Sequence, residues 1–220
     1  MVEQKITEIK KSIVEYSVLV ESMIDKTIKG LLKKDKTMLE TVMKIDEPTA
    51  NNREVEIEEN CIVVIAEESP KAKDLRTILM AIKMNNDLER IADMAVNICE
   101  SGIYLAAKNE IVHFSEIEKM SSLAVTMMKD SINAFIFEDA DLAKDVCERD
   151  DAVDDLGDKI LSQAIKQMAV DPNAIKANLH VLRVARDLER LGDISTNISE
   201  EVIFMVEGRV IKHGKDEQIK

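Results

Sequence analysis

Two stretches of this chain repeat one acidic pattern at a spacing of 100 residues. The first, DLERIADMAVNICE, spans residues 87–100, and the second, DLERLGDISTNISE, spans residues 187–200. Eight of the fourteen positions are identical, and six of those eight are polar or charged. A duplication that served only a hydrophobic core would keep its apolar positions instead. The repeated acids therefore indicate a repeated site.

These acids share one face if each copy is helical, because side chains four residues apart lie one above the other on a helix. The residues at this spacing are Glu89, Asp93 and Asn97 in the first copy and Glu189, Asp193 and Asn197 in the second. Like charges so placed cost roughly 0.2–0.5 kcal/mol in an isolated helix. Because the chain carries this cost twice, we expect a cation to offset it. Oxygen ligands suit hard or borderline cations such as Mg²⁺, Mn²⁺ or Fe.

A further set of acids precedes the second copy, in the stretch ERDDAVDDLGD at residues 148–158. Two pairs in this stretch are four residues apart, namely Asp150 with Asp154 and Asp151 with Asp155. If this helix packs antiparallel against the helix of the second copy, one of the two pairs faces Glu189 and Asp193. Four carboxylates from two helices could then hold one or more metal ions.

The matching stretch of the first half is IDEPTANNREVEIEE, at residues 45–59. It places Glu47, Asn51 and Glu54 on one face of a helix, but Pro48 is expected to kink or interrupt that helix. The sequence therefore predicts a weaker metal site in the first half than in the second.

Two other interpretations of the acids stay open. In one, the acids form a solvated face that is ion-paired with Arg90, Arg183, Arg186 and Arg190 and holds no ligand. In the other, the chain is a metal-dependent enzyme related to the di-iron carboxylate bundles, which use two Glu-x-x-His motifs. A single motif of this kind occurs in the sequence, from Glu110 to His113, so the enzyme interpretation is the less well supported one.

The helices that position these residues follow from apolar residues at helical spacing and from the small number of Gly and Pro residues. Six helical segments are predicted, at about residues 6–30, 34–68, 70–108, 114–136, 139–170 and 172–208. The third and sixth follow similar stops, where Ser69 and Asp171 are expected to be N-caps and the next proline to open the helix. No sustained alternation of apolar and polar residues predicts a strand.

A unit of three helices is therefore used twice. We expect an all-α chain of two tandem antiparallel three-helix bundles, which either pack side by side or fuse into one layer. The predicted domains are residues 1–108, residues 109–210 and a polar tail at residues 211–220.

The charge balance and the cysteines limit the class of protein. The formal net charge is −13, so direct binding to nucleic acid is not expected. Three isolated cysteines predict reduced thiols in a cytoplasmic protein. The N-terminal residues lack the apolar stretch of a signal peptide, and no apolar run is long enough to span a bilayer. We expect a soluble chain, which leaves room for a membrane-bound partner.

The paired motifs, each behind a helix restart at SPKAKDLR or DPNAIKAN, resemble the PhoU family of phosphate-transport accessory proteins over about residues 5–210. The resemblance implies two three-helix bundles with pseudo-twofold symmetry, and a homodimer is expected. It also implies a cytoplasmic, non-enzymatic negative regulator of the phosphate regulon. Its expected partners are the ATPase subunit of the phosphate ABC transporter and a PhoR-type sensor histidine kinase, so that it is peripheral to the membrane through them.

Family members are associated with metal ions at E/DxxxD motifs. The resemblance carries these motifs to Glu89 with Asp93, Glu189 with Asp193 and Asp150 with Asp154, whereas Glu47 and Asn51 stand where another acid pair is expected. The implied cofactor is a divalent or trivalent ion such as Fe, Mn, Mg or Zn, in a mononuclear or multinuclear site. The alternative functions are an accessory protein of another anion transporter and a metal-dependent helical-bundle enzyme.

Overall fold

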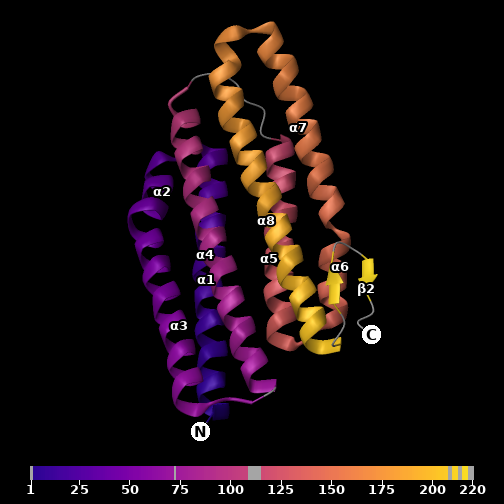
Figure 1. Ribbon diagram of the computed structural model, residues 1–220. Helices are drawn as coiled ribbons and strands as arrows, with labels where there is room; N and C mark the ends of the chain where they lie inside the picture. Colours follow the sequence, from indigo (N-terminus) through magenta and orange to yellow (C-terminus); the bar gives the residue numbers. More distant parts are fainter. Residues whose placement is uncertain (1, 72, 109–114, 208–209, 213–214, 218–220) are drawn as a thin grey trace.

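The computed structural model describes residues 2–71, 73–108, 115–207, 210–212 and 215–217. The elements of the first half are α1 (Val2–Lys33), α2 (Lys36–Thr41), the π-helix η1 (Val42–Asp46), α3 (Glu47–Glu68) and α4 (Lys73–Ala106). Those of the second half are α5 (Ser115–Phe137), α6 (Ala140–Glu148), α7 (Asp150–Val170), the 3₁₀ helix η2 (Pro172–Ala174) and α8 (Ile175–Glu207). Two short strands follow, β1 (Val210–Lys212) and β2 (Lys215–Glu217). The predicted all-α fold with tandem bundles is confirmed (Figure 1).

The turn after the first helix of each half is built in the same way. Lys34 and Glu138 both adopt left-handed backbone conformations, with φ of 54° and 53°. The next residue is an aspartate in both cases, and its side chain caps the following helix by accepting backbone N–H bonds. Because Asp35 corresponds to Asp139, the first helix of the unit repeats at a spacing of 104 residues.

The second helix of each half is interrupted, as the sequence predicts at Pro48 in the first half, whereas a continuous helix is predicted in the second half. In the first half, the π-helical turn η1 directly precedes Pro48, which lies in the first turn of α3. Proline has no N–H to donate and its ring crowds the carbonyl four residues earlier, so the predicted interruption at this residue is confirmed. In the second half, Arg149 separates α6 from α7, with φ of −88° and ψ of −10°.

The two predicted N-caps before the third helices have different outcomes. Asp171 is confirmed as a cap, since its side chain accepts a hydrogen bond from the backbone N–H of Asn173 at 2.9 Å. The prediction for Ser69 is wrong. Ser69 instead ends α3 in a left-handed conformation with φ of 47°, and α4 begins only at Lys73.

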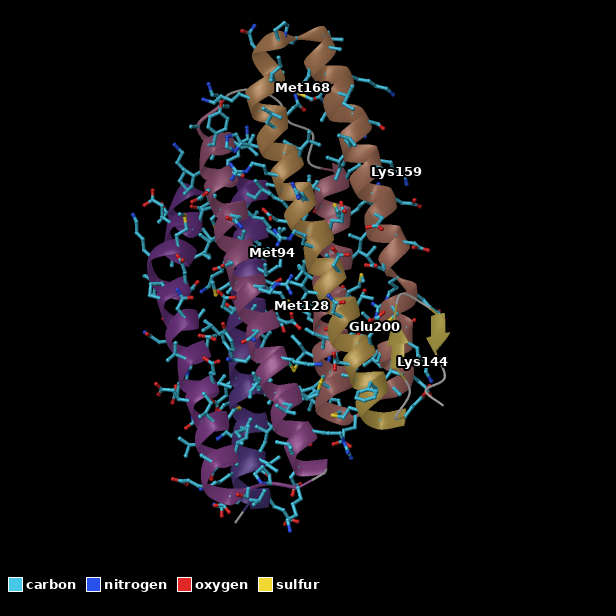
Figure 2. The ribbon with its side chains drawn as sticks, in the orientation of Figure 1. Met94, Met128, Lys144, Lys159, Met168 and Glu200 are labelled. Atoms are coloured by element: carbon cyan, nitrogen blue, oxygen red, sulfur yellow. The ribbon has the colours of Figure 1, made fainter. Side chains whose placement is uncertain are left out.

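The two bundles fuse into one body. Helices α3, α4, α8 and α7 lie side by side, with α1 behind α4 and α5 behind α8 (Figure 1). The buried apolar residues of both halves form one continuous core. Met94 on α4 and Met128 on α5 lie inside it, as expected of methionines that fill a core (Figure 2).

Helices α4 and α8 run antiparallel at the centre of this body. The rings of Tyr104 on α4 and His180 on α8 stack at a centroid distance of 4.0 Å, and Lys83 pairs with Glu201 at 2.6 Å further along. The two motif copies therefore lie on neighbouring helices at the junction of the repeats.

The C-terminal segment differs from the predicted strandless tail. Strands β1 and β2 form an antiparallel hairpin in which Val210 pairs with Glu217 and Lys212 with Lys215. Valine and isoleucine in β1 favour extended backbone, which a pairing segment can use even without a long alternating pattern. No helix among the described residues is long and apolar enough to cross a membrane.

Candidate functional site

The second repeat brings its four predicted carboxylates together between α7 and α8. Two glycines make room for them. A Cβ on Gly157 would lie 3.2 Å from Oε2 of Glu189, and a Cβ on Gly192 would lie 3.3 Å from Oδ1 of Asp150. Because both glycines lack side chains, the carboxylates of Glu189 and Asp150 each lie against the backbone of the opposite helix.

The pKa values of these groups show that the carboxylates repel one another. Burial, followed by the neighbouring charges of Asp154 and Asp193, raises the pKa of Asp150 to about 6, while Thr196 opposes the shift. Burial and the charge of Asp193 also raise the pKa of Asp154, and burial with the charge of Asp154 raises that of Glu189. Of the two predicted pairs on α7, the pair Asp150 and Asp154 therefore faces α8.

The ion-paired interpretation is not supported within the described part of the chain. Arg90 pairs with Asp87 at 3.2 Å and not with Glu89. Arg186 lowers the pKa of Glu189, but it is the weakest of the named influences on that group. The clustered carboxylates of both repeats make no ion pair with any described residue.

The first repeat forms a smaller cluster between α3 and α4. The pKa of Glu89 is raised by burial first, and then by the charges of Asp93 and Glu54. The backbone carbonyl of Glu54 accepts a hydrogen bond from Nδ2 of Asn85 at 2.9 Å, which fixes the two helices at this level. Of the predicted group Glu47, Asn51 and Glu54, only Glu54 therefore lies with the motif acids. It is the member furthest from Pro48 in the sequence.

The other two members of that predicted group lie differently. Glu47 lies near the buried thiol of Cys99, whose pKa burial raises to about 11 with a smaller contribution from Glu47. Asn51 is exposed on α3. The structure therefore places Glu47 toward the far end of the α3 and α4 pair, away from Glu54.

Tyr16 is a residue of the first cluster that the acidic motifs do not predict. Its ring is fully buried on α1, and its hydroxyl has no hydrogen-bond partner among the residues described. Burial raises its pKa strongly, and the charges of Glu89, Glu54 and Asp93 raise it further, so the hydroxyl lies close to the first cluster. At the repeat spacing of 104, Tyr16 corresponds to Met120, whose methyl carbon lies 3.6 Å from the Cβ position of Gly157. The first cluster therefore lies close to the phenol of Tyr16, and the second lies close to the thioether of Met120.

The two motif asparagines lie in different surroundings. Asn197 lines a groove of about 710 Å³ at the junction of the repeats, together with Arg90, Arg190 and Asp193. Asn97 is half-buried one turn beyond Asp93 on α4. The groove is mixed in charge, because arginines from both motif copies line it along with carboxylates.

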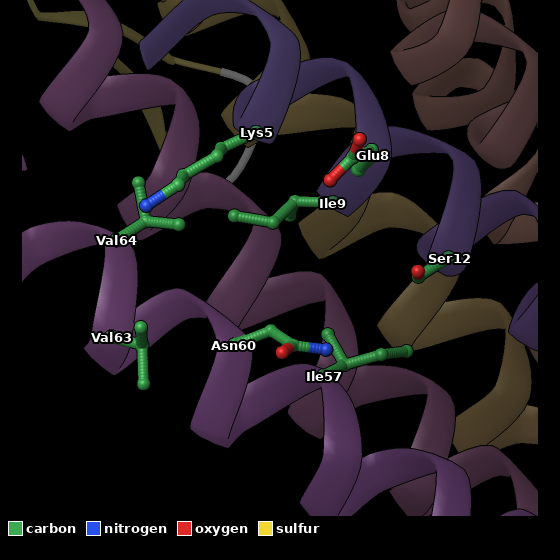
Figure 3. Close-up of a pocket in the computed structure, with 8 residues that line it drawn as sticks. All are labelled: Lys5, Glu8, Ile9, Ser12, Ile57, Asn60, Val63 and Val64. Atoms are coloured by element: carbon green, nitrogen blue, oxygen red, sulfur yellow. The ribbon is translucent and has the colours of Figure 1, made fainter. Parts of the chain in front are cut away.

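A hollow of about 320 Å³ lies elsewhere, between α1 and α3 (Figure 3). Its polar residues include Lys5, which pairs with Glu67 and Glu68 at 2.9 Å each. None of the predicted site residues lines it. The motif of Glu110 and His113 and the tail residue His213 lie outside the described residues.

The donors of both clusters fit a hard cation. They are unpaired carboxylate oxygens, and Oδ1 of Asp150 is buried without a well-formed hydrogen bond within the described chain. Three or more Asp, Glu, His or Cys side chains are nowhere arranged to hold a metal ion among the described residues. The carboxylates would therefore have to draw closer to one another around an ion.

Comparison with known proteins identifies the family. The model of the PhoU domain matches residues 13–102 and again residues 117–202, which are the two repeats. The chain belongs to the PhoU family. A relative from Aquifex aeolicus, described as a phosphate-specific transport system accessory protein PhoU homolog, is 37% identical over 210 residues, covering 96% of this chain and 95% of the relative.

Solved structures of the family share the architecture. The crystal structure of PhoU from Pseudomonas aeruginosa matches with a TM-score of 0.91 and 31% identity, covering 94% of this chain and all of that one. The phosphate transport system regulatory protein PhoU from Streptococcus pneumoniae matches with a TM-score of 0.89 at 23% identity, which shows the shared fold.

Proposed function

We propose that this chain is a cytoplasmic regulator that lowers phosphate uptake and represses phosphate-starvation genes when phosphate is plentiful. It would act without catalysis, as an adaptor between the ATPase subunit of a phosphate ABC transporter and a PhoR-type sensor histidine kinase. The observation that supports this most directly is that both repeats match the PhoU domain. A relative that matches over nearly the whole chain is named as an accessory protein of phosphate-specific transport.

The proposed role has a direct test. Purified full-length chain would be tested for binding to the transporter ATPase and to the kinase, in phosphate-rich and phosphate-free buffer. We expect binding to both under high phosphate, and derepression of a phosphate-starvation reporter when the gene is deleted. Absence of binding to both partners in phosphate-rich buffer would refute the adaptor role.

The acidic clusters would hold divalent or trivalent metal ions as part of this function. Glu189, Asp193, Asp150 and Asp154 supply the second site, and the first would use Glu89, Asp93 and Glu54. A bound ion would neutralise the mutual repulsion of the carboxylates and fix the relative position of the two helices. Two unpaired acid clusters at equivalent places in both repeats support this proposal.

Metal content can be measured on tag-free protein by inductively coupled plasma mass spectrometry, after exposure to Mn²⁺, Fe²⁺, Zn²⁺ or Mg²⁺ in turn. The wild type is expected to retain near-stoichiometric metal, and the variant Glu189→Gln with Asp193→Asn to lose the share of the second site. The matched control is Asp151→Asn with Asp155→Asn, which removes two exposed charges from the same helix pair. Equal metal content in all three proteins would show that the cluster binds no ion.

A further inference from the structure

One ion pair occupies the same place in both repeats, but its two charges are exchanged. In the first repeat, Nζ of Lys26 on α1 lies 2.7 Å from Oδ2 of Asp46, the last residue before α3. In the second repeat, Nη2 of Arg149, the last residue before α7, lies 2.7 Å from Oδ2 of Asp130 on α5. The first helix thus supplies the base of the pair in one repeat and the acid in the other.

The two pairs stand at equivalent positions, although the first repeat is one residue longer here. Lys26 and Asp130 are 104 residues apart, which is the spacing of the first helix of the unit. Asp46 and Arg149 are 103 residues apart, and the π-turn η1 accounts for the difference of one residue. A π-helical turn closes its hydrogen bonds over five residues instead of four, so it takes up the extra residue within the helix. Both pairs therefore join the first helix of a repeat to the break in its second helix.

The exchange of the charges shows which property the two repeats share. Neither position keeps its residue type between the repeats, whereas the attraction between the two helices is present in both. Ion pairs between fully exposed side chains contribute little, but the side chains of Arg149 and Asp130 are only 23% and 27% exposed. The break in the second helix therefore depends on an ion pair at this place and not on one particular residue.

Arg149 connects three helices at this break. Its guanidinium donates a hydrogen bond to Asp130 on α5, and it also lies 3.0 Å from Oδ2 of Asp145 on α6. Its backbone carbonyl accepts a hydrogen bond of 3.2 Å from the N–H of Ala152, in the first turn of α7. The direction in which α7 starts is therefore tied to the contacts of this one residue.

The next residue, Asp150, belongs to the second acidic cluster. Oδ1 of Asp150 would lie 3.3 Å from a Cβ on Gly192, so this carboxylate points to α8, whereas the side chain of Arg149 points to α5. Within the described chain, Arg149 forms its ion pairs with Asp130 and Asp145 and not with Asp150. A positive charge beside a proposed cation site is unfavourable by itself, so the presence of Arg149 there needs a compensating role.

We propose that Arg149 is a positioning residue of the second acidic cluster. Through Asp130 and Asp145, its guanidinium fixes the break between α6 and α7 and keeps the carboxylate of Asp150 directed toward α8. Groups that orient a metal ligand without touching the ion strongly affect the affinity for that ion. The inference rests on the metal binding of the proposed function, and it names a residue outside the cluster that this binding requires.

The test uses full-length protein in which Glu89→Gln with Asp93→Asn silences the first cluster, so that a Mn²⁺ titration reports the second cluster alone. In this parent protein, Arg149→Gln removes the arginine. Asp130→Asn with Arg149→Gln removes both charges, so that neither is left unpaired. Asp130→Lys with Arg149→Asp gives the second repeat the charge order of the first.

The matched control is Lys129→Gln, which also removes one positive charge and breaks an ion pair, the one with Glu21 of α1 at 2.8 Å. Charge alone predicts tighter Mn²⁺ binding in Arg149→Gln, since a cation beside the cluster is lost. We expect instead that calorimetry shows about tenfold weaker binding in Arg149→Gln and in the neutral double variant. The variant with exchanged charges should bind at least as tightly as the parent, and the control should bind like it.

Hydrogen exchange of the metal-free proteins reports on the break itself. The N–H groups in the first turn of α7, including that of Ala152, should exchange faster in Arg149→Gln and in the neutral double variant, and at the parental rate in the other two. Unchanged exchange in Arg149→Gln would overturn the proposal, and so would unchanged or tighter Mn²⁺ binding. An exchanged-charge variant that binds as weakly as Arg149→Gln would also overturn it. If Arg149→Gln does not fold, the neutral double variant decides both measurements.

The two measurements separate this inference from the proposed function. If the wild type binds Mn²⁺ and the Arg149 variants bind it equally well, the metal binding stands and the positioning role fails. If the wild type binds no Mn²⁺, the proposed metal binding fails, and hydrogen exchange alone decides the inference. Faster exchange in the first turn of α7, restored by the exchanged charges, then supports the role of Arg149, and equal exchange in all variants overturns it.

Discussion

Oε2 of Glu189 lies 3.2 Å from the position that a Cβ on Gly157 would occupy, so the carboxylate of one helix is seated on the bare backbone of the other. Gly157→Ala would fill that position. Alanine favours the helix over glycine by about 1 kcal/mol, so we expect unchanged or higher thermal stability. The methyl group displaces Glu189, and we expect the affinity of the second cluster for Mn²⁺ to fall about tenfold, as measured by calorimetry.

A stabilised Gly157→Ala protein with wild-type Mn²⁺ affinity would show that Glu189 does not reach the ion. Glu189→Gln serves as the comparison, because it keeps the shape of the side chain and removes its charge.

Asp150 is expected to destabilise the metal-free fold at neutral pH. Its pKa is raised from 3.8 to about 6 in the folded protein, because the fold favours the neutral carboxyl group over the charged one. The stabilisation by the neutral form is complete below pH 4 and is lost as the pH rises through 6. In protein treated with a chelator, Asp150→Asn should raise the free energy of unfolding at pH 7.5 by about 1 kcal/mol, a value reduced for solvent screening because the group is only partly buried. The measurement is urea unfolding at pH 4.5 and 7.5, where the gain should be smaller at the lower pH.

The exposed neighbour Asp151 provides the control for Asp150. A gain of the same size in Asp151→Asn would mean that net charge alone, and not the cluster, accounts for the effect.

The stack of Tyr104 on His180 is expected to weaken in acid. Burial lowers the pKa of His180, and the charges of Arg183 and Lys176 lower it further. The stabilisation is therefore complete above the ordinary value of 6.5 and is lost as the pH falls through the lowered pKa. In an Asp150→Asn background, where the largest opposing effect is removed, the free energy of unfolding should fall between pH 7 and pH 5.

His180→Phe should flatten this dependence while keeping the ring stack. If the slope between pH 7 and pH 5 is the same in His180→Phe, a group other than His180 causes it.

Leu39 fills the space between two glycines of the first repeat. A Cβ on Gly30 would lie 2.8 Å from one of its methyl carbons, and a Cβ on Gly102 would lie 2.9 Å from the other. Overpacking of a core costs typically 1–3 kcal/mol, and the gain in helix propensity offsets about 1 of it. We expect Gly102→Ala to lower the free energy of unfolding by up to about 2 kcal/mol in chemical denaturation.

The double variant Gly102→Ala with Leu39→Ala separates crowding from other causes. Its loss should be clearly smaller than the sum of the two single losses, since the added methyl then occupies vacated space. Additive losses would contradict the proposed contact.

The sequence predicted the helices because their apolar spacing reports the buried face directly, and it predicted the second acid cluster because two helices with acids four residues apart can meet only in a few ways. The stop before α8 was predicted correctly, since the side chain of Asp171 caps the 3₁₀ turn η2 that continues into α8. The prediction for Ser69 was wrong because a serine before a proline can stand at either end of a helix. Ser69 ends α3 in a left-handed conformation, which the spacing of apolar residues does not indicate.

The first cluster was predicted less well, for a physical reason. The sequence places Glu47, Asn51 and Glu54 on one stripe. In the structure the π-turn before Pro48 lies beside Glu47, and only Glu54 joins the motif acids. The spacing of apolar residues predicts Tyr16 to be an ordinary core aromatic on α1. Its relation to the acids depends on how α1 packs behind α4, which the spacing of residues within one helix does not report.

The antiparallel pairing of α4 with α8 bears on the relation between the two repeats. Both helices carry the same motif, and they pack against each other in opposite directions. A protein with one repeat would leave this face of its third helix open to water, and a second identical molecule could cover it in the same antiparallel way. The contact between α4 and α8 therefore has the geometry of a subunit interface between two three-helix units, held within one chain.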